Sequence, residues 1–128
     1  MSKNQARILI VEDDDSRCSW FHQEFAKYDR DATSDVSVAV TLLAENDYSL
    51  IFLDHDLAEE HYFSEMADDG LTGFAVAEWL ARNPDQQANA QIVIHSLNYV
   101  GAQRMLDVLH DAGRKAEHVP FPYLPWLF

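Results

Sequence analysis

The chain has 128 residues, of which 48% are hydrophobic, and its formal net charge is −13. This length fits one domain, and the apolar content is enough for a core and too high for a disordered chain. Binding to duplex DNA or to an anionic membrane surface depends on clustered Lys and Arg, so the charge argues against both. A single cysteine, Cys18, excludes an intramolecular disulfide. With no apolar signal region and no spanning segment, a soluble, cytoplasmic protein is expected.

The first half of the chain alternates short apolar runs with amphipathic segments. Residues Arg7–Glu12 (RILIVE) are typical of a strand buried on both faces. The next segment, Ser16–Tyr28, carries aromatic residues at helical spacing. A weak second strand is expected at Asp35–Ala39, followed by a short helix at Val40–Asn46. The clearest strand of the sequence is Ser49–Asp54 (SLIFLD).

The second half begins with a long acidic stretch, Ala58–Leu71, that has neither helical nor strand periodicity. Loops of this length in compact domains are functional or disordered, so the stretch is interpreted either as a lid or as a disordered segment. The elements expected after it are a helix, a strand, a helix and a strand, at Thr72–Asn83, Gln91–Ser96, Tyr99–Ala112 and Ala116–Pro120. The tail, Phe121–Phe128, has too many prolines for a helix.

Strands and helices that alternate in this way predict a parallel sheet with helices on both faces, formed by residues 1–128 as a single domain. The expected fold class is a doubly wound, five-stranded α/β sheet of the flavodoxin-like type, with strand order 2-1-3-4-5. Ligands of such sheets bind beyond the carboxyl ends of the strands, where the strand order reverses. The strand ends are therefore the place to look for a functional site.

Acidic residues stand at the ends of two strands that are neighbours in this kind of sheet. The first strand is followed by Glu12 and Asp13, and the third ends in Asp54. Three carboxylates in one small space raise each other's pKa unless a cation compensates, and a hard divalent ion, Mg²⁺ or Mn²⁺, suits that role. The alternative is a set of solvated loop acids, among which Asp14 and Asp15 are candidates for helix caps.

The motif ILIVEDD, the aspartate that ends the third strand, the hydroxyl of Ser96 at the end of the fourth and a Pro-Phe pair after the fifth resemble a response-regulator receiver domain. The resemblance implies that Asp13 ligates Mg²⁺ directly and that Glu12 acts through water. It also implies that Asp54 is the phosphoacceptor, that the carbonyl of Asp56 is a further metal ligand and that Ser96 contacts the phosphate.

Three features depart from the receiver pattern. Receivers carry a lysine where this chain has Val119. Because that lysine pairs with the phosphoryl group, Asp54 is expected to be a poor phosphoacceptor. The loop after the third strand is longer than in receivers and has Ala58 at the usual proline position. The sequence given also ends soon after the fifth strand, so the final helix is expected to be missing or replaced by the tail.

A narrower family fits the motifs better. LDHDL at 53–57, IHSLN at 94–98 and VPF at 119–121, with Thr-Gly at 72–73 and Gly101, closely resemble the cyclic-phosphate-processing receiver-like domains. The resemblance implies a divalent-metal-dependent, phosphate-handling domain that hydrolyses a cyclic phosphate. The expected partner is a phosphate-containing small molecule or an RNA end, with no duplex DNA and no membrane, and a protein partner stays open.

Two histidines, His55 and His95, stand at the ends of neighbouring strands beside the acidic residues. Opening a cyclic phosphate needs a base, an acid and a cation, and imidazoles suit the first two roles because they titrate near neutrality. Asn98 is expected to donate a hydrogen bond to a phosphoryl oxygen. If Asp54 and Ser96 lie level, however, alternation along the strands turns both rings away from the site. A half-buried, satisfied histidine is the competing interpretation.

Three functions follow from these interpretations and stay open. The first is an enzyme, a metal-dependent cyclic phosphoesterase. The second is a stand-alone receiver or pseudo-receiver in phosphorelay signalling, with Asp54 as phosphoacceptor. The third is a protein that binds a phosphorylated ligand without turnover. The pattern assigns no role to His61, in the acidic loop, or to His118, in the last strand.

Overall fold

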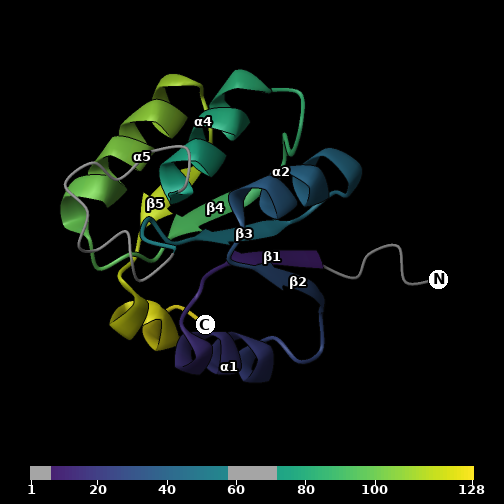
Figure 1. Cartoon of the computed structure of the whole chain (residues 1–128), viewed down its shortest axis with the longest axis vertical. Coiled ribbons are helices and arrows are strands. Elements are labelled where there is room, and N and C mark those ends of the chain that lie inside the picture. Colours follow the sequence, from purple (N-terminus) through teal and green to yellow (C-terminus); the bar gives the residue numbers. More distant parts are fainter. Residues whose placement is uncertain (1–6, 58–71) are drawn as a thin grey trace.

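The computed structural model describes residues 7–57 and 72–128. Its strands form one five-stranded parallel sheet in the order β2-β1-β3-β4-β5 (Figure 1), which confirms the predicted fold class. In chain order the strands are β1 (Arg7–Val11), β2 (Asp29–Thr33), β3 (Leu50–Leu53), β4 (Gln91–Ile94) and β5 (Ala116–His118). The predicted long loop at 58–71 lies outside the described residues, and so do the lid and disorder interpretations of it.

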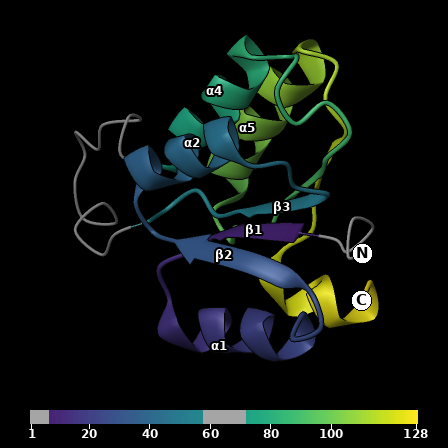
Figure 2. The ribbon, with the colours of Figure 1, turned by 90° about the vertical axis from the view of Figure 1, so that its right-hand side faces the viewer.

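Helices cover both faces of the sheet (Figure 2). The face that carries α2, α4 and α5 lies opposite the face that carries α1 and the C-terminal turn η2. The bounds are α1 (Asp15–Glu24), α2 (Val36–Glu45), α4 (Gly73–Arg82), α5 (Tyr99–Asp111) and η2 (Phe121–Trp126). Within the described part of the chain, none of these helices has the length and apolar character needed to cross a bilayer.

Alternation along the strands divides the core into two apolar clusters. In β1, Leu9 and Val11 belong to the cluster under α2, α4 and α5, whereas Ile8 and Ile10 belong to the cluster under α1 and η2. All four side chains are buried, because a parallel sheet covered on both faces leaves neither side of its strands in water. The same alternation decides which face each residue takes just beyond the strand ends.

The predicted second strand at 35–39 is wrong, because those residues lie in and just before helix α2. The second strand is the earlier and more polar segment Asp29–Thr33. It forms the edge of the sheet, so none of its residues is fully buried and an apolar run is not required. Valines alternate at the start of α2 as in a strand, but the side chain of Asp35 accepts a hydrogen bond from the backbone N–H of Val38 and begins a helix.

The C-terminal tail forms a 3₁₀ helix, η2, although its prolines predicted no helix. Two of the prolines are compatible with this outcome, because Pro120 precedes the helix and Pro122 lies in its first turn, where a missing N–H costs little. Leu124 is fully buried in the cluster under α1, and the Phe128 ring lies 5.5 Å from that of Phe25. This apolar anchoring places η2 beside α1, in accord with a final helix replaced by the tail (Figure 1).

Candidate functional site

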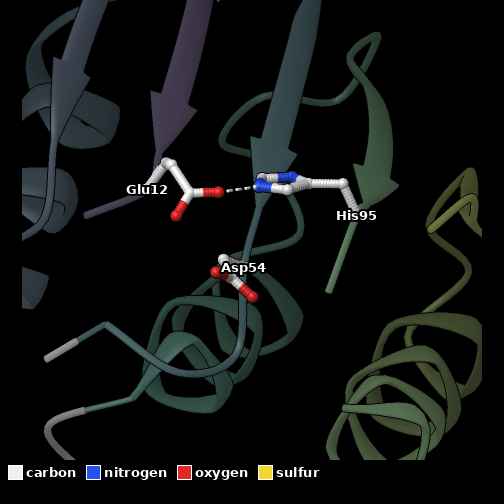
Figure 3. Close-up of side chains that lie close together, drawn as sticks. All are labelled: Glu12, Asp54 and His95. Atoms are coloured by element: carbon white, nitrogen blue, oxygen red, sulfur yellow. Dashed lines mark hydrogen bonds and ion pairs between the residues drawn. The ribbon is translucent and has the colours of Figure 1, made fainter. Parts of the chain in front are cut away.

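The register of the three central strands places Glu12, Asp54 and His95 side by side. Val11 is paired with Leu53, and Leu53 with Ile94, so the next residue of each strand lies level with the other two. The three side chains lie close together (Figure 3), and the ring of His95 packs against that of Phe21 in α1. One ligand atom of each lies within 4.8 Å of the others, and all three residues are buried.

This register corrects the assumption that Asp54 lies level with Ser96. The backbone N–H of His95 donates to the carbonyl of Leu53 at 3.0 Å, which makes His95 the neighbour of Asp54. Alternation therefore turns His95 toward Asp54 instead of away from it. The Ser96 hydroxyl is buried one position further on and accepts a hydrogen bond from the backbone N–H of Asn98 at 3.0 Å.

The carboxylate of Glu12 is held at both oxygens. Its Oε1 lies 2.7 Å from Nε2 of His95, and its Oε2 accepts the backbone N–H groups of Asp13 and Asp14, each at 3.0 Å. Burial of the His95 ring, packed 5.2 Å from that of Phe21, lowers the pKa of His95 to about 4. The imidazole is therefore neutral at pH 7, with the Nε2 proton donated to Glu12. This geometry favours an orienting role for His95, while its predicted role as acid or base stays a prediction.

Asp54 has one oxygen in a hydrogen bond and one without. Its Oδ1 accepts the backbone N–H of His55 at 2.8 Å, whereas its Oδ2 is buried and has no hydrogen-bond partner among residues 7–57 and 72–128. Burial, and then the charge of Glu12, raise the pKa of Asp54 to about 6. A buried carboxylate oxygen without a donor needs a proton or a cation beside it.

A residue that the sequence reasoning missed, Arg17, faces this oxygen. Its Nη1 lies 3.5 Å from Oδ2 of Asp54 and 3.7 Å from Oε1 of Glu12. Arg17 lies in the first turn of α1, where Asp14 caps the helix by accepting the Arg17 backbone N–H at 2.9 Å. The sequence did carry a signal for Arg17. It is a cation that closely follows the strand-end acids, in the first turn of a helix, where the helix dipole disfavours positive charge.

The donor set around Asp54 fits a hard divalent ion. His95 directs its Nε2 proton at Glu12, so the anionic ligand atoms of the converging group are the carboxylate oxygens of Glu12 and Asp54. Asp13 adds a half-buried carboxyl whose pKa is raised, first by burial and then by the charge of Glu12. Oxygen donors of this kind suit Mg²⁺ or Mn²⁺. The side chain of Asp13 is not among the three that converge, so its predicted direct ligation stays a prediction.

The ring of His55 lies apart from this group, on the side of α5. Its Nδ1 donates to Oδ1 of Asp56 at 2.9 Å, and a Cβ placed on Gly101 of α5 would lie 2.5 Å from the ring. The Asn98 amide lies 3.3 Å from Oδ2 of Asp56, and its oxygen caps α5 by accepting the Gly101 N–H. The structure thus separates the two imidazoles that the sequence offers as base and acid, because His95 lies level with Asp54 and His55 is the next residue after Asp54, on the other face. The roles expected of Asn98 and of the Asp56 carbonyl stay predictions.

Of the two histidines without an assigned role, the structure describes only His118. His118 donates from Nε2 to the carbonyl of Ser96 at 2.8 Å, and its ring lies 5.2 Å from that of Tyr99. It therefore braces the backbone at Ser96. His61 lies outside the described residues.

Asp54→Asn is expected to stabilise the metal-free protein at neutral pH and to remove stabilisation by Mg²⁺. The folded-state pKa of about 6 lies above the ordinary value of 3.8, so Asp54 costs the fold nothing below pH 4. Its cost grows between pH 4 and pH 6, where the unfolded chain is ionised and the folded one is not, and is complete above pH 6. Two pKa units correspond to about 3 kcal/mol, so a gain of about 1–3 kcal/mol is expected above pH 6. Urea unfolding in EDTA at pH 4 and pH 8 measures it.

The matched control is Asp15→Asn, which changes an exposed acid in the first turn of α1. It should change the free energy of unfolding by no more than about 0.5 kcal/mol at either pH. A stability of Asp54→Asn equal to that of the wild type at pH 8 would contradict the charged, buried state assigned to Asp54.

The sheet order, the helices on both faces and the acids at the ends of β1 and β3 together define a receiver-type domain. The chain belongs to the cyclic-phosphate processing receiver domain family, whose model matches residues 8–111. No curated protein sequence matches the chain significantly.

Solved structures of receivers share the fold at low sequence identity. The signal receiver domain of a putative LuxO repressor protein from Vibrio parahaemolyticus is 19% identical, with a TM-score of 0.65 over 96% of this chain and 86% of that one. Chemotaxis protein CheY4 of Vibrio cholerae is also 19% identical, with a TM-score of 0.65 over 95% and 91%. Response regulator TrrA of Thermotoga maritima, solved with Mg²⁺ and BeF, is 17% identical, with a TM-score of 0.64 over 91% and 86%. At these identities the likeness shows the fold alone.

Proposed function

We propose that this domain is a divalent-metal-dependent, phosphate-handling enzyme that hydrolyses a cyclic phosphate of a nucleotide or an RNA end. The observation that carries the proposal is the buried Oδ2 of Asp54, which has no hydrogen-bond partner in the described part of the chain and lies beside Glu12 and Arg17. An oxygen in that state is suited to a cation and, through it, to a phosphate. Family membership supports the cyclic phosphate as the substrate class.

In this proposal Asp13 and Asp54 hold Mg²⁺ or Mn²⁺, Glu12 acts through water, and the carbonyl of Asp56 is a further ligand. When bound, the ion neutralises charge that develops on the phosphoryl oxygens. His95 orients Glu12 through the 2.7 Å contact and so sets the shape of the metal site. Among the described residues, the one other partner near Oε1 of Glu12 is the guanidinium of Arg17, at 3.7 Å.

The reaction adds water to phosphorus, breaks one P–O ester bond and delivers a proton to the leaving oxygen. Ser96 and Asn98 are proposed to contact the phosphate, since both lie directly after β4 at the carboxyl end of the sheet. Proton transfer by His55 also belongs to the proposal. The buried Nε2 of His55 has no hydrogen-bond partner among the described residues, which leaves one ring nitrogen unassigned and supports the proposal.

The test is a screen of the purified chain, with Mg²⁺ or Mn²⁺, against 2′,3′-cyclic, 3′,5′-cyclic and cyclic dinucleotide substrates. Asp13→Asn should weaken metal stabilisation and lower turnover together. His95→Ala should also lower both, by about 10- to 100-fold, because it loosens Glu12. His55→Ala should lower turnover alone. Asp15→Asn is the control and should match the wild type. Absence of turnover, together with equal melting with and without metal, would contradict the proposal.

One observation also favours a second candidate, a phosphorelay receiver with Asp54 as phosphoacceptor. The Oδ2 of Asp54, which has no hydrogen-bond partner among the described residues, lies just after the end of β3, the position of a receiver's phosphoacceptor. Val119, in place of a cationic residue, argues against a stable phosphoaspartate. Stoichiometric, long-lived modification of Asp54 by acetyl phosphate with Mg²⁺ would establish the receiver function instead. A phosphate-binding protein without turnover would show ligand and metal binding but neither reaction.

A further inference from the structure

Arg17 is the cation that ion-pairs with the buried carboxylates of the candidate site. Among the Lys and Arg side chains of residues 7–57 and 72–128, it alone lies within 4 Å of Asp54 or Glu12. Its side chain is 24% exposed, so the guanidinium spans the boundary between the buried acids and solvent. It reaches the acids from α1, the helix whose Phe21 packs against the ring of His95.

The contacts of Arg17 leave its donors in reach of another ligand. The distances of 3.5 and 3.7 Å are longer than the 2.7–2.9 Å of a charge-assisted hydrogen bond. Within the described part of the chain the guanidinium therefore pairs with these acids by charge alone. Its carbon lies 5.4 Å from the centre of the Phe121 ring, which supports the planar group from one side.

The support from Phe121 connects Arg17 to the end of β5. Phe121 follows Val119 by two residues, its backbone N–H donates to the carbonyl of His95 at 2.9 Å, and both Val119 and Phe121 pack against the cluster under α1. Val119 and the Phe121 ring that supports Arg17 therefore pack against the same cluster under α1. The first turn of α1 supplies a positive charge to a place that the last strand leaves without one.

We infer that Arg17 binds a phosphoryl oxygen of the substrate at Asp54 and takes the place of the lysine that is absent at Val119. The inference deepens the proposed function and rests on it for the substrate class. A guanidinium suits this task because its fixed fork of donors matches two oxygens of a phosphate. A metal ion held by the carboxylates would repel the guanidinium and leave its donors for the substrate oxygen.

The test compares two affinities of Arg17→Gln by titration calorimetry, for Mg²⁺ alone and for inorganic phosphate in the presence of Mg²⁺. Loss of a charged donor is expected to weaken phosphate binding about 10-fold or more. Affinity for Mg²⁺ alone should stay equal or rise, since a competing cation has been removed from the carboxylates. A merely structural role for Arg17 would lower both affinities together.

A second variant tests the substitution directly. Adding Val119→Lys to Arg17→Gln should restore phosphate binding. The change in log Kd caused by Arg17→Gln should be reversed by at least about half. Arg17→Lys keeps the charge without the fork and should fall between the wild type and Arg17→Gln, which keeps the test valid if the Gln variant unfolds. Arg82→Gln, on the exposed face of α4, is the control.

The outcomes separate the inference from the proposed function. If the wild type binds Mg²⁺ and phosphate and Arg17→Gln binds phosphate within about 2-fold of it, the inference is wrong and the proposed function stands. Failure of Val119→Lys to restore any affinity also counts against it. If the wild type binds neither probe and hydrolyses no cyclic phosphate, the proposed function and the inference fall together.

Discussion

Gly73→Ala is expected to destabilise the fold by about 3 kcal/mol or more and to disturb the metal site. Gly73 is the first residue of α4, and its N–H donates to the carbonyl of His55 at 2.8 Å. A Cβ at this position would lie 1.8 Å from the backbone oxygen of Asp54 and 2.8 Å from its carbonyl carbon. Backbone cannot rotate away as a side chain can, so either α4 or the Asp54–His55 segment must shift.

Urea unfolding and Mg²⁺ titration of Gly73→Ala measure the two parts of this effect. The matched control is Gly113→Ala, where no atom lies within 4 Å of the added Cβ. Gly113 has φ of +79°, so alanine there costs about 1–2 kcal/mol by backbone strain alone and should leave Mg²⁺ affinity unchanged. A loss for Gly73→Ala no larger than that of the control would show that the close packing of α4 on Asp54 is not needed.

Arg114→Met is expected to destabilise the fold by about 3–5 kcal/mol without touching the candidate site. Arg114 is 8% exposed, and its guanidinium donates to four backbone carbonyls at the end of α4 and in the turn after it: Leu80, Asn83, Gln86 and Gln87. Methionine retains much of the apolar stem but leaves these oxygens without their donor. Burial lowers the pKa of Arg114. Its hydrogen bonds within the described residues go to backbone carbonyls, which compensate its charge in place of a carboxylate.

The comparison for Arg114→Met is Arg82→Met, at a side chain that is 74% exposed and pairs with Glu78 one turn away. An exposed pair of this kind contributes little, so the change should be within about 0.5 kcal/mol. Urea unfolding gives both values, and hydrogen exchange of the amides in 83–90 should rise selectively in Arg114→Met. Equal unfolding free energies for the two variants would contradict the carbonyl-binding role.

The candidate site combines an unfavourable set of buried charges with the packing that holds it in place. Burial raises the pKa of Asp54 and lowers that of His95, so both groups lean toward their neutral forms. A divalent ion reverses this preference for Asp54, because ligation requires the carboxylate. Metal binding should therefore weaken as the pH falls through 6. Without a metal ion, the negative charge of the buried carboxylates is compensated only in part, by Arg17 at 3.5 Å from Asp54.

Most helices and the inner strands could be predicted from the sequence because the spacing of their apolar residues reveals which faces are buried. The apolar runs of β1, β3 and β4 are buried on both sides, so their composition alone marks them as inner strands. The edge strand β2 could not be found in this way, since it is half exposed and rich in charge. The 3₁₀ helix of the tail also escaped prediction, because its stability comes from the contacts of Leu124 with residues far away in the sequence.

The sequence by itself determined the fold class, the family resemblance and the presence of Glu12 and Asp54 at the ends of neighbouring strands. Only the tertiary structure decided that His95, and not Ser96, lies level with Asp54, and that His55 lies against α5. It also brought Arg17 to the carboxylates from another element. The physical reason is that the register of parallel strands, and the approach of a helix to them, depend on packing between segments distant in the chain. A shift of one residue exchanges the two faces of a strand, and local patterns do not fix it.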